Sequence, residues 1–391
     1  MSEARSWRIG NVQIVADQQV VVGEVTVEDG IITAITAAAD AAQADDSIPY
    51  IDGKGGWLLP GFIDIHVHGG YGHDFMDATA EAYDGITKFH AANGTTTILA
   101  TTVTASPERI EAVLKAAAAY RAGDMQYAEL AGVHLEGPFI SEKWPGAQNP
   151  AFIVPPQTEW LERWIAEWPA LIKIMTLAPE KDGALAVIEW LRQQGIVASL
   201  GHTDATYDEV VTAVQHGLCH GVHTYNAMTG LHHRKPGTLG AMMTEDAITA
   251  ELIADGHHVH PAAIKVLTRT KPADKLVLIT DAMSAAGLGD GQYDLGGLAV
   301  DVRGGVATLH EGNSLAGSTL TMIEAFRFML KHTELTVPEV SRLASANPAK
   351  VLGLEQQTGS ISVGKRADLV WTDDNHQMLA TWVKGRTVFS V

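Results

Sequence analysis

The stretch Leu59-Pro60-Gly61-Phe62-Ile63-Asp64-Ile65-His66-Val67-His68-Gly69 runs from a turn through a short apolar segment into two histidines. It contains the first of eight short apolar runs that alternate with Ala-rich amphipathic segments, a pattern that predicts repeated βα units and a parallel sheet. Eight such units predict a closed (β/α)₈ TIM-type barrel. The runs cover residues 62–68, 96–103, 131–136, 172–177, 197–202, 221–225, 250–254 and 276–281.

The two ends of the chain differ from the middle. Residues 7–36 and 359–391 carry short β-branched runs, and the pairs Asp29-Gly30 and Lys384-Gly385 are typical of hairpin turns. We therefore expect the terminal segments to pair into one small β-sandwich domain. The predicted division is residues 1–58 with 355–391 for this domain and residues 59–354 for the barrel.

Size and composition restrict the possible partners. The chain has 391 residues, a formal net charge of −19 and one cysteine, Cys219. The charge argues against nucleic-acid and anionic-membrane binding, and no apolar run approaches the roughly 20 residues that span a bilayer. A lone cysteine forms no internal disulfide, and residues 1–7 lack the pattern of a secretory signal, so we expect a cytoplasmic protein.

Polar residues fall where five of the apolar runs end. Run one ends in His66-Val67-His68, and the others end in or reach Glu136, His202, His223 and Asp281. A single histidine after a strand is more often structural than a ligand. Alternate residues of a strand point the same way, however, so His66 and His68 would present two imidazoles to one point. Five strands that end in such groups predict a metal site at the C-terminal face of the barrel, where barrel enzymes hold their chemistry.

The first run resembles the signature of the amidohydrolase superfamily. Further motifs, in the same order along the chain, resemble the N-acetylglucosamine-6-phosphate deacetylase family. These motifs are His134-Leu135-Glu136-Gly137-Pro138-Phe139, Gly201-His202-Thr203, His223-Thr224-Tyr225-Asn226-Ala227-Met228, Ile253-Ala254-Asp255-Gly256, Thr280-Asp281-Ala282 and Leu315-Ala316-Gly317-Ser318.

The resemblance implies a homodimeric enzyme of amino-sugar metabolism that hydrolyses N-acetylglucosamine 6-phosphate to glucosamine 6-phosphate and acetate. Glu136, His202 and His223 would hold a divalent ion that activates water, and Asp281 would serve as general base and then acid. The alternative for Asp281 is a helix N-cap. Because His66 and His68 are both present, one or two ions are expected, and Zn²⁺ and Fe²⁺ are both chemically reasonable.

Run four distinguishes this chain from many two-metal amidohydrolases. Those enzymes bridge their ions with a carboxylated lysine at the end of strand four, whereas the fourth run here ends in Leu177-Ala178-Pro179-Glu180 and has its lysine, Lys173, near the start. The resemblance implies that Glu136 supplies the anionic ligand instead.

Substrate recognition is also implied by the resemblance. Arg234, in the run His232-His233-Arg234-Lys235, would bind the sugar phosphate and can come from the neighbouring subunit in this family, although such a charge run is usually a solvated face. Gln148 stands where some relatives place a histidine that contacts the acetyl carbonyl. The expected substrate-binding residues are Ala147, Gln148, Asn226, Ala227, Arg234, His258, Leu315, Ala316 and Gly317.

Two other functions remain open from the sequence. A related amidohydrolase could act on N-acetylgalactosamine 6-phosphate or another N-acyl compound. A non-catalytic barrel could keep a structural metal and act as an assembly partner, but it would be expected to lose Asp281 or a metal ligand, and this chain retains all of them.

Overall fold

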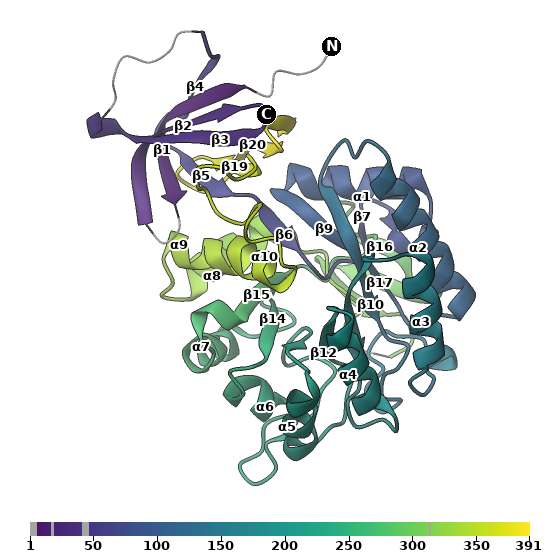
Figure 1. Ribbon diagram of the computed structural model, residues 1–391. Helices are drawn as coiled ribbons and strands as arrows, with labels where there is room; N and C mark the ends of the chain where they lie inside the picture. Colours follow the sequence, from purple (N-terminus) through teal and green to yellow (C-terminus); the bar gives the residue numbers. More distant parts are fainter. Residues whose placement is uncertain (1–5, 17–18, 41–46, 313) are drawn as a thin grey trace.

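The computed structural model describes residues 6–16, 19–40, 47–312 and 314–391, and it divides into a barrel and a smaller β domain that holds both ends of the described chain (Figure 1). Residues 1–5, on which the prediction about a secretory signal partly depends, lie outside the described residues. Within the described part of the chain, no helix combines the length and apolarity needed to cross a membrane.

The barrel is formed by eight parallel strands, so the predicted fold class is confirmed. Every predicted run overlaps a strand, although the sixth run, residues 221–225, shares only Gly221 with its strand. In chain order they are β6 (Phe62–Asp64), β9 (Thr95–Thr102), β10 (Glu129–Glu136), β11 (Ile172–Leu177), β12 (Val197–Leu200), β13 (His220–Gly221), β14 (Thr249–Ile253) and β15 (Leu276–Ile279). Neighbours in this order are hydrogen-bonded from β6 to β15. Just beyond the first and last strands, the backbone N–H of Asp281 donates to the carbonyl of His66 at 2.9 Å, which ties the two ends of the sheet together.

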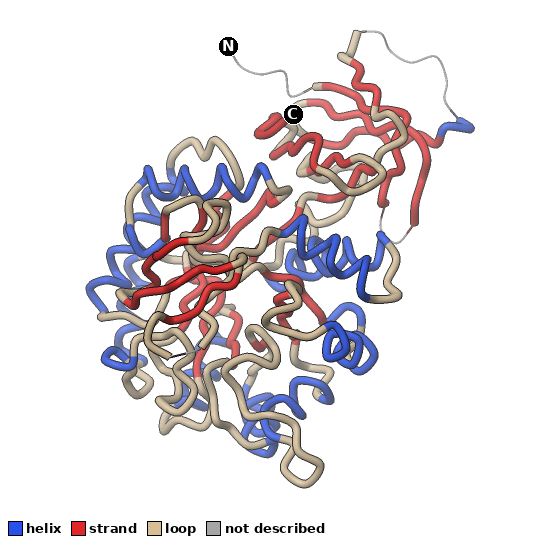
Figure 2. The backbone as a smooth tube through the Cα atoms, turned by 180° about the vertical axis from the view of Figure 1, so that it is seen from behind, coloured by secondary structure: helices blue, strands red, loops and turns tan. Residues whose placement is uncertain are grey.

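Helices follow the strands and cover the outside of the barrel (Figure 2). They are α1 (Ala80–Ala92), α2 (Pro107–Ala122), α3 (Thr158–Glu167), α4 (Ala184–Gln193), α5 (Tyr207–His216), α6 (Gly237–Thr244), α7 (Pro261–Thr270), α8 (Met322–His332), α9 (Val337–Ser341) and α10 (Asn347–Val351). Several begin at a threonine N-cap, as α1 does at Thr79 and α5 at Thr206. Because helices cover the sheet, a strand such as β9 is buried at every residue.

The two ends of the chain form one β domain, as expected. Its sheet has the order β21-β20-β19-β5-β1-β2-β3, with β4 paired to β1. The strands are β1 (Trp7–Ala16), β2 (Gln19–Glu28), β3 (Ile31–Ala37), β4 (Tyr50–Asp52), β5 (Trp57–Pro60), β19 (Leu369–Thr372), β20 (Met378–Val383) and β21 (Arg386–Ser390). Both predicted hairpins are present. The domain has its own core, in which the rings of Trp7 and Trp382 lie 4.6 Å apart and so join the first and last segments of the chain.

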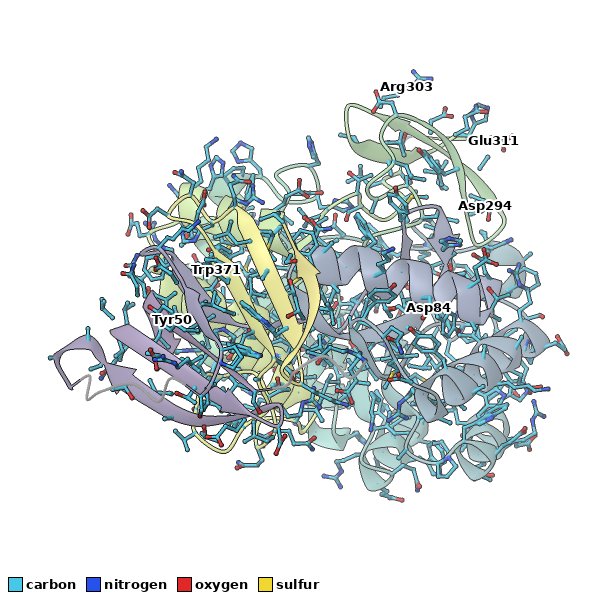
Figure 3. The ribbon with its side chains drawn as sticks, turned by 90° about the horizontal axis from the view of Figure 1, so that it is seen from above. Tyr50, Asp84, Asp294, Arg303, Glu311 and Trp371 are labelled. Atoms are coloured by element: carbon cyan, nitrogen blue, oxygen red, sulfur yellow. The ribbon has the colours of Figure 1, made fainter. Side chains whose placement is uncertain are left out.

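A three-stranded antiparallel sheet after β15 is absent from the sequence prediction. It consists of β16 (Gly291–Leu295), β17 (Leu298–Arg303) and β18 (Val306–Leu309). Figure 3 shows it projecting from the barrel, with Arg303 and Glu311 at its outer side. Its inner end reaches the C-terminal face of the barrel, where Leu295 lines the cavity described below.

Candidate metal centre

The five strand-end positions converge on one point. His66 and His68 follow β6, Glu136 is the last residue of β10, and the remaining three residues each lie two positions beyond their strand. All six side chains are buried, and Glu136 lies at their centre. Its Oε1 atom is 3.1 Å from Nε2 of His202, 3.1 Å from Nε2 of His223 and 3.3 Å from Nε2 of His66.

Glu136, His202 and His223 have the geometry of a metal-ligand set. The Nε2 atoms of the two histidines lie 3.1 Å apart, so the three donor atoms form a triangle with sides of 3.1 Å. Ligand atoms at about 2.0–2.1 Å from a tetrahedral zinc ion are separated by about 3.3–3.4 Å. The donor set therefore fits a divalent ion closely.

His66, His68 and Asp281 form a second group beside the first. One ligand atom from each lies within 4.8 Å of the others. Oδ1 of Asp281 is 3.2 Å from Nε2 of His68 and 3.7 Å from Nε2 of His66, and Oε2 of Glu136 is 3.3 Å from Nε2 of His68. Glu136 thus contacts both groups: its Oε1 atom lies near His202, His223 and His66, and its Oε2 atom lies near His68. Nε2 of His66 is buried and has no hydrogen-bond partner, as expected for a nitrogen reserved for a metal.

The opposite ring nitrogens show how the imidazoles are oriented. Nδ1 of His202 lies 3.0 Å from the carbonyl of Trp144, and Nδ1 of His223 lies 3.2 Å from the carbonyl of Asn226. A carbonyl oxygen only accepts, so Nδ1 carries the hydrogen in both rings and Nε2 keeps its lone pair. This is the usual support of a metal-binding histidine.

The charges of the cluster favour a cation. Burial raises the pKa of Glu136, but His66, His202 and His223 together lower it more, so the pKa lies well below its usual value. The pKa of Asp281 is also lowered overall, because His66 and His68 lower it by more than burial raises it. Burial lowers the pKa of His68, yet Asp281 and Glu136 raise it to about 10. Both carboxylates are ionised at neutral pH, and binding of a metal would displace protons from the histidines.

The backbone of the cluster is strained. His202, His223 and Asp281 have φ values of 48°, 28° and 51°, in a region that residues with a side chain rarely adopt. Such strain persists only where the surroundings enforce it, and it concentrates at functional sites. Each of these residues directs its side chain inward at the point where its strand ends.

A cavity of about 350 Å³ opens above the cluster. His68, Glu136, His202, His223 and Asp281 line it, as do seven of the expected substrate-binding residues: Ala147, Gln148, Asn226, Ala227, His258, Leu315 and Gly317. Ala316 is buried and is not among the lining residues, and neither is Arg234. The size falls in the range of small-molecule sites.

Gln148 forms a hydrogen bond to Glu136 that the sequence did not predict. Its Nε2 donates to Oε2 of Glu136 at 2.7 Å, and its Oε1 accepts from the backbone N–H of Thr104 at 2.6 Å. One amide hydrogen is therefore used within the protein, and one remains to face the cavity.

Arg234 and His258 differ in their surroundings. Arg234 is exposed on the loop before α6, where its guanidinium contacts only the neighbouring His233 among the contacts of the described residues. His258 is largely buried, and its Nδ1 lies 2.6 Å from Oδ2 of Asp255. Burial lowers the pKa of His258, but Asp255 raises it more, so that His258 carries positive charge at the cavity wall over a wider pH range.

Three buried polar residues beneath the cluster were given no role from the sequence: Glu251, His220 and His134. Glu251 lies in the middle of β14, fully buried, between the rings of His66 and His220. His134 is also fully buried, and burial lowers its pKa to about 3. A carboxylate in the centre of an apolar strand was the available signal for Glu251, because such a charge needs buried partners.

Comparisons with known proteins agree with this geometry. Residues 57–388 match the amidohydrolase family. The chain is 41% identical to an N-acetylglucosamine-6-phosphate deacetylase of Bacillus subtilis (strain 168), over 99% of this chain and 98% of that protein. It is also 41% identical to an N-acetylgalactosamine-6-phosphate deacetylase of Escherichia coli O157:H7, over 84% and 87%.

A solved structure gives the same result for the fold. A mutant N-acetyl-D-glucosamine-6-phosphate deacetylase from Mycobacterium smegmatis, in complex with N-acetyl-D-glucosamine-6-phosphate, superposes with a TM-score of 0.92 at 34% identity. The match covers 98% of this chain and 100% of that one, so both the barrel and the β domain are shared.

Proposed function

The chain belongs to the amidohydrolase family, and from this premise we propose that it hydrolyses N-acetylglucosamine 6-phosphate to glucosamine 6-phosphate and acetate. The observation that carries the proposal is the convergence of four imidazoles and two carboxylates at the floor of a cavity of about 350 Å³. The relatives from Bacillus subtilis and Mycobacterium smegmatis, which bear the name of this activity, support the choice of substrate.

Glu136, His202 and His223 would hold one divalent ion, and His66 and His68 would hold a second that shares Glu136. The mixture of imidazole and carboxylate suits Zn²⁺ and Fe²⁺. A bound ion would polarise the amide carbonyl and lower the pKa of water toward neutrality.

Asp281 moves the proton in this proposal. Its carboxylate takes a proton from the water that attacks the acetyl carbon. It returns the proton to the amide nitrogen as the C–N bond breaks, because an amine leaves readily only when protonated. Its low pKa keeps Asp281 ionised and able to accept the proton. The second amide hydrogen of Gln148 would be donated to the acetyl oxygen, where negative charge develops.

The sugar phosphate would be held by His258, by the backbone of Asn226 and Ala227, and by Arg234 from the neighbouring subunit. The exposure of Arg234 and its absence from the cavity wall support a contribution across a dimer interface. Complementation tests this directly. A mixture of Arg234→Gln and Asp281→Asn subunits should regain about a quarter of the wild-type activity if Arg234 acts across the interface, since half of the dimers are mixed and each contains one intact site. No recovery after verified subunit exchange would place Arg234 in its own subunit.

Acetate release from purified protein tests the activity. The assay compares N-acetylglucosamine 6-phosphate with N-acetylglucosamine, before and after chelation and after readdition of Zn²⁺ or Fe²⁺. We expect release that depends on the metal and on the phosphate. Absence of release with either ion would overturn the proposal.

The relative from Escherichia coli supports a second candidate, the deacetylation of N-acetylgalactosamine 6-phosphate. The two sugars differ only in the configuration at C4, so kcat/KM for both epimers under one set of conditions decides between them. A preference for the galactose epimer would replace the first assignment.

A further inference from the structure

Glu251 contacts one residue of each ligand group, His66 and His223, from the interior of the barrel. Its side chain is fully buried in β14, and Oε2 lies 2.8 Å from Nδ1 of His66. The same oxygen accepts from the backbone N–H of His223 at 3.3 Å, and Oε1 lies 2.9 Å from Nε2 of His220. A buried carboxylate is costly unless it is fully partnered, and these three contacts satisfy it.

The contact with His66 differs from those of the other ligands. His202 and His223 direct Nδ1 at backbone carbonyls, which the fold supplies whatever the side chain. His66 instead directs Nδ1 at the carboxylate of Glu251, so the ring depends on one particular side chain for its orientation. An ionised carboxylate only accepts, which places a hydrogen on Nδ1 and leaves Nε2 as the nitrogen that can bind a metal. That Nε2 atom has no hydrogen-bond partner and lies 3.3 Å from Glu136.

His68 lacks such a contact. Its Nδ1 atom is buried without a hydrogen-bond partner. Of the two first-strand histidines, His66 is therefore the one whose Nδ1 atom contacts a carboxylate. Binding at the first-strand position would depend mainly on how well His66 is held.

We propose that Glu251 is a positioning residue that selects the two-ion form of the centre, by holding His66 in the tautomer and orientation that bind the second ion. The proposal rests on the proposed metal-dependent function. Other groups orient Glu136 and the imidazole rings of His202 and His223. A glutamine oxygen can still accept from the backbone N–H of His223, so loss of the negative charge at Glu251 would weaken the second ion and leave the first in place. Removal of a comparable partner of a metal ligand typically lowers metal affinity by about 10- to 100-fold.

The test is the metal content of Glu251→Gln, which keeps the shape of the side chain and removes its charge. Wild type, Glu251→Gln, His66→Ala and the double variant are loaded with Zn²⁺, dialysed at graded free Zn²⁺ and analysed for zinc per subunit, with circular dichroism as a check of folding. Glu180→Gln serves as a matched control. Glu180 follows the C-terminal end of β11, and it accepts hydrogen bonds from Thr203 and Asp204 rather than from an imidazole.

We expect two ions per subunit in wild type and in Glu180→Gln. Glu251→Gln should bind the second ion about 10- to 100-fold more weakly and retain the first. His66→Ala should lose the second ion, and the double variant should bind zinc no more weakly than His66→Ala alone, because the two residues act through one contact.

Each other result has a definite meaning. Unchanged affinity for both ions in Glu251→Gln would overturn the positioning role while leaving the proposed function intact. Equal loss of both ions from a folded Glu251→Gln would also overturn it, because the carboxylate would then support the whole centre. If wild-type protein binds no zinc, the proposed function itself fails, independently of Glu251. If Glu251→Gln does not fold, the His66→Ala variant decides, because retention of two ions by that variant would refute the role of His66.

Discussion

Replacement of Asp281 by asparagine tests the proposed mechanism most directly. The two side chains have the same shape, and an amide oxygen can still accept a hydrogen bond from Nε2 of His68, which lies 3.2 Å from Oδ1 in the native protein. The substitution therefore keeps the packing of a residue that is 8% exposed, and it removes the capacity to accept a proton. Glu136, His202 and His223 keep their mutual contacts, so the first ion should remain bound.

The expected loss is large because proton transfer is needed twice in each turnover. A positioned general acid or base contributes about 10²- to 10⁴-fold to the rate. We expect kcat to fall by at least 10²-fold, which corresponds to about 2.7 kcal/mol or more of transition-state stabilisation. KM should change little, because the aspartate acts on the reacting water more than on the sugar.

The assay is acetate release at saturating N-acetylglucosamine 6-phosphate, with zinc content and thermal unfolding measured on the same preparations. Asp208→Asn is the matched control, since Asp208 is exposed in the first turn of α5 and, among the described residues, has no hydrogen bond or ion pair with a residue of the cavity. A kcat within threefold of wild type for Asp281→Asn, with equal zinc content, would refute the role given to this residue.

Three further variants test other parts of the structure. Gln148→Leu should lower kcat by on the order of 10²-fold, because it removes a donor to the acetyl oxygen; steady-state kinetics that show only a KM effect would contradict this. Arg234→Gln should raise KM for the phosphorylated sugar by about 10-fold or more without changing the thermal midpoint, because one charge-assisted contact is worth about 1.5 kcal/mol or more; an unchanged KM would exclude a phosphate contact. Burial lowers the pKa of His90 to about 4, so the unfolded chain gains a proton first as pH falls, and stability is lost between about pH 6.5 and 4. His90→Gln should therefore remove about 2 kcal/mol of the fall in unfolding free energy between pH 7.5 and 5, measured by urea denaturation, and an equal fall in both proteins would refute this.

The sequence predicted structure best at positions where a residue type has few other structural roles. The eight apolar runs predicted the barrel. A histidine or carboxylate that ends an apolar strand needs a partner, so five such strand ends predicted a metal site at the C-terminal face. The hairpins of the terminal domain were predictable because Asp29-Gly30 and Lys384-Gly385 favour tight turns. The pairing of β5 with β19 could be expected only in outline, since no local pattern sets the register between segments so distant in sequence.

Contacts that depend on three-dimensional geometry were not predictable. Gln148 lies on a loop after β10, and its hydrogen bond to Glu136 follows from the path of that loop rather than from any spacing. The sheet β16–β18 was not predicted, although the pairs Gly296-Gly297 and Gly304-Gly305 mark its turns. Glu251 lies in the middle of β14, whereas the polar residues that predicted the site lie at strand ends.

Glu251 lies in the interior of the barrel, where polar residues at strand ends give no indication of a charge. A barrel interior is a packed core, so a charge placed there is retained only when other polar groups meet it at the same level. Glu251 is met by His220 from the neighbouring strand β13 and by His66 from beyond β6, on the other side of β15. These strands bring together residues that are far apart in the sequence, and only closure of the sheet produces the contact. The cavity floor is thus supported by a second polar layer, and the orientation of His66 depends on the closure of the barrel rather than on β6 alone.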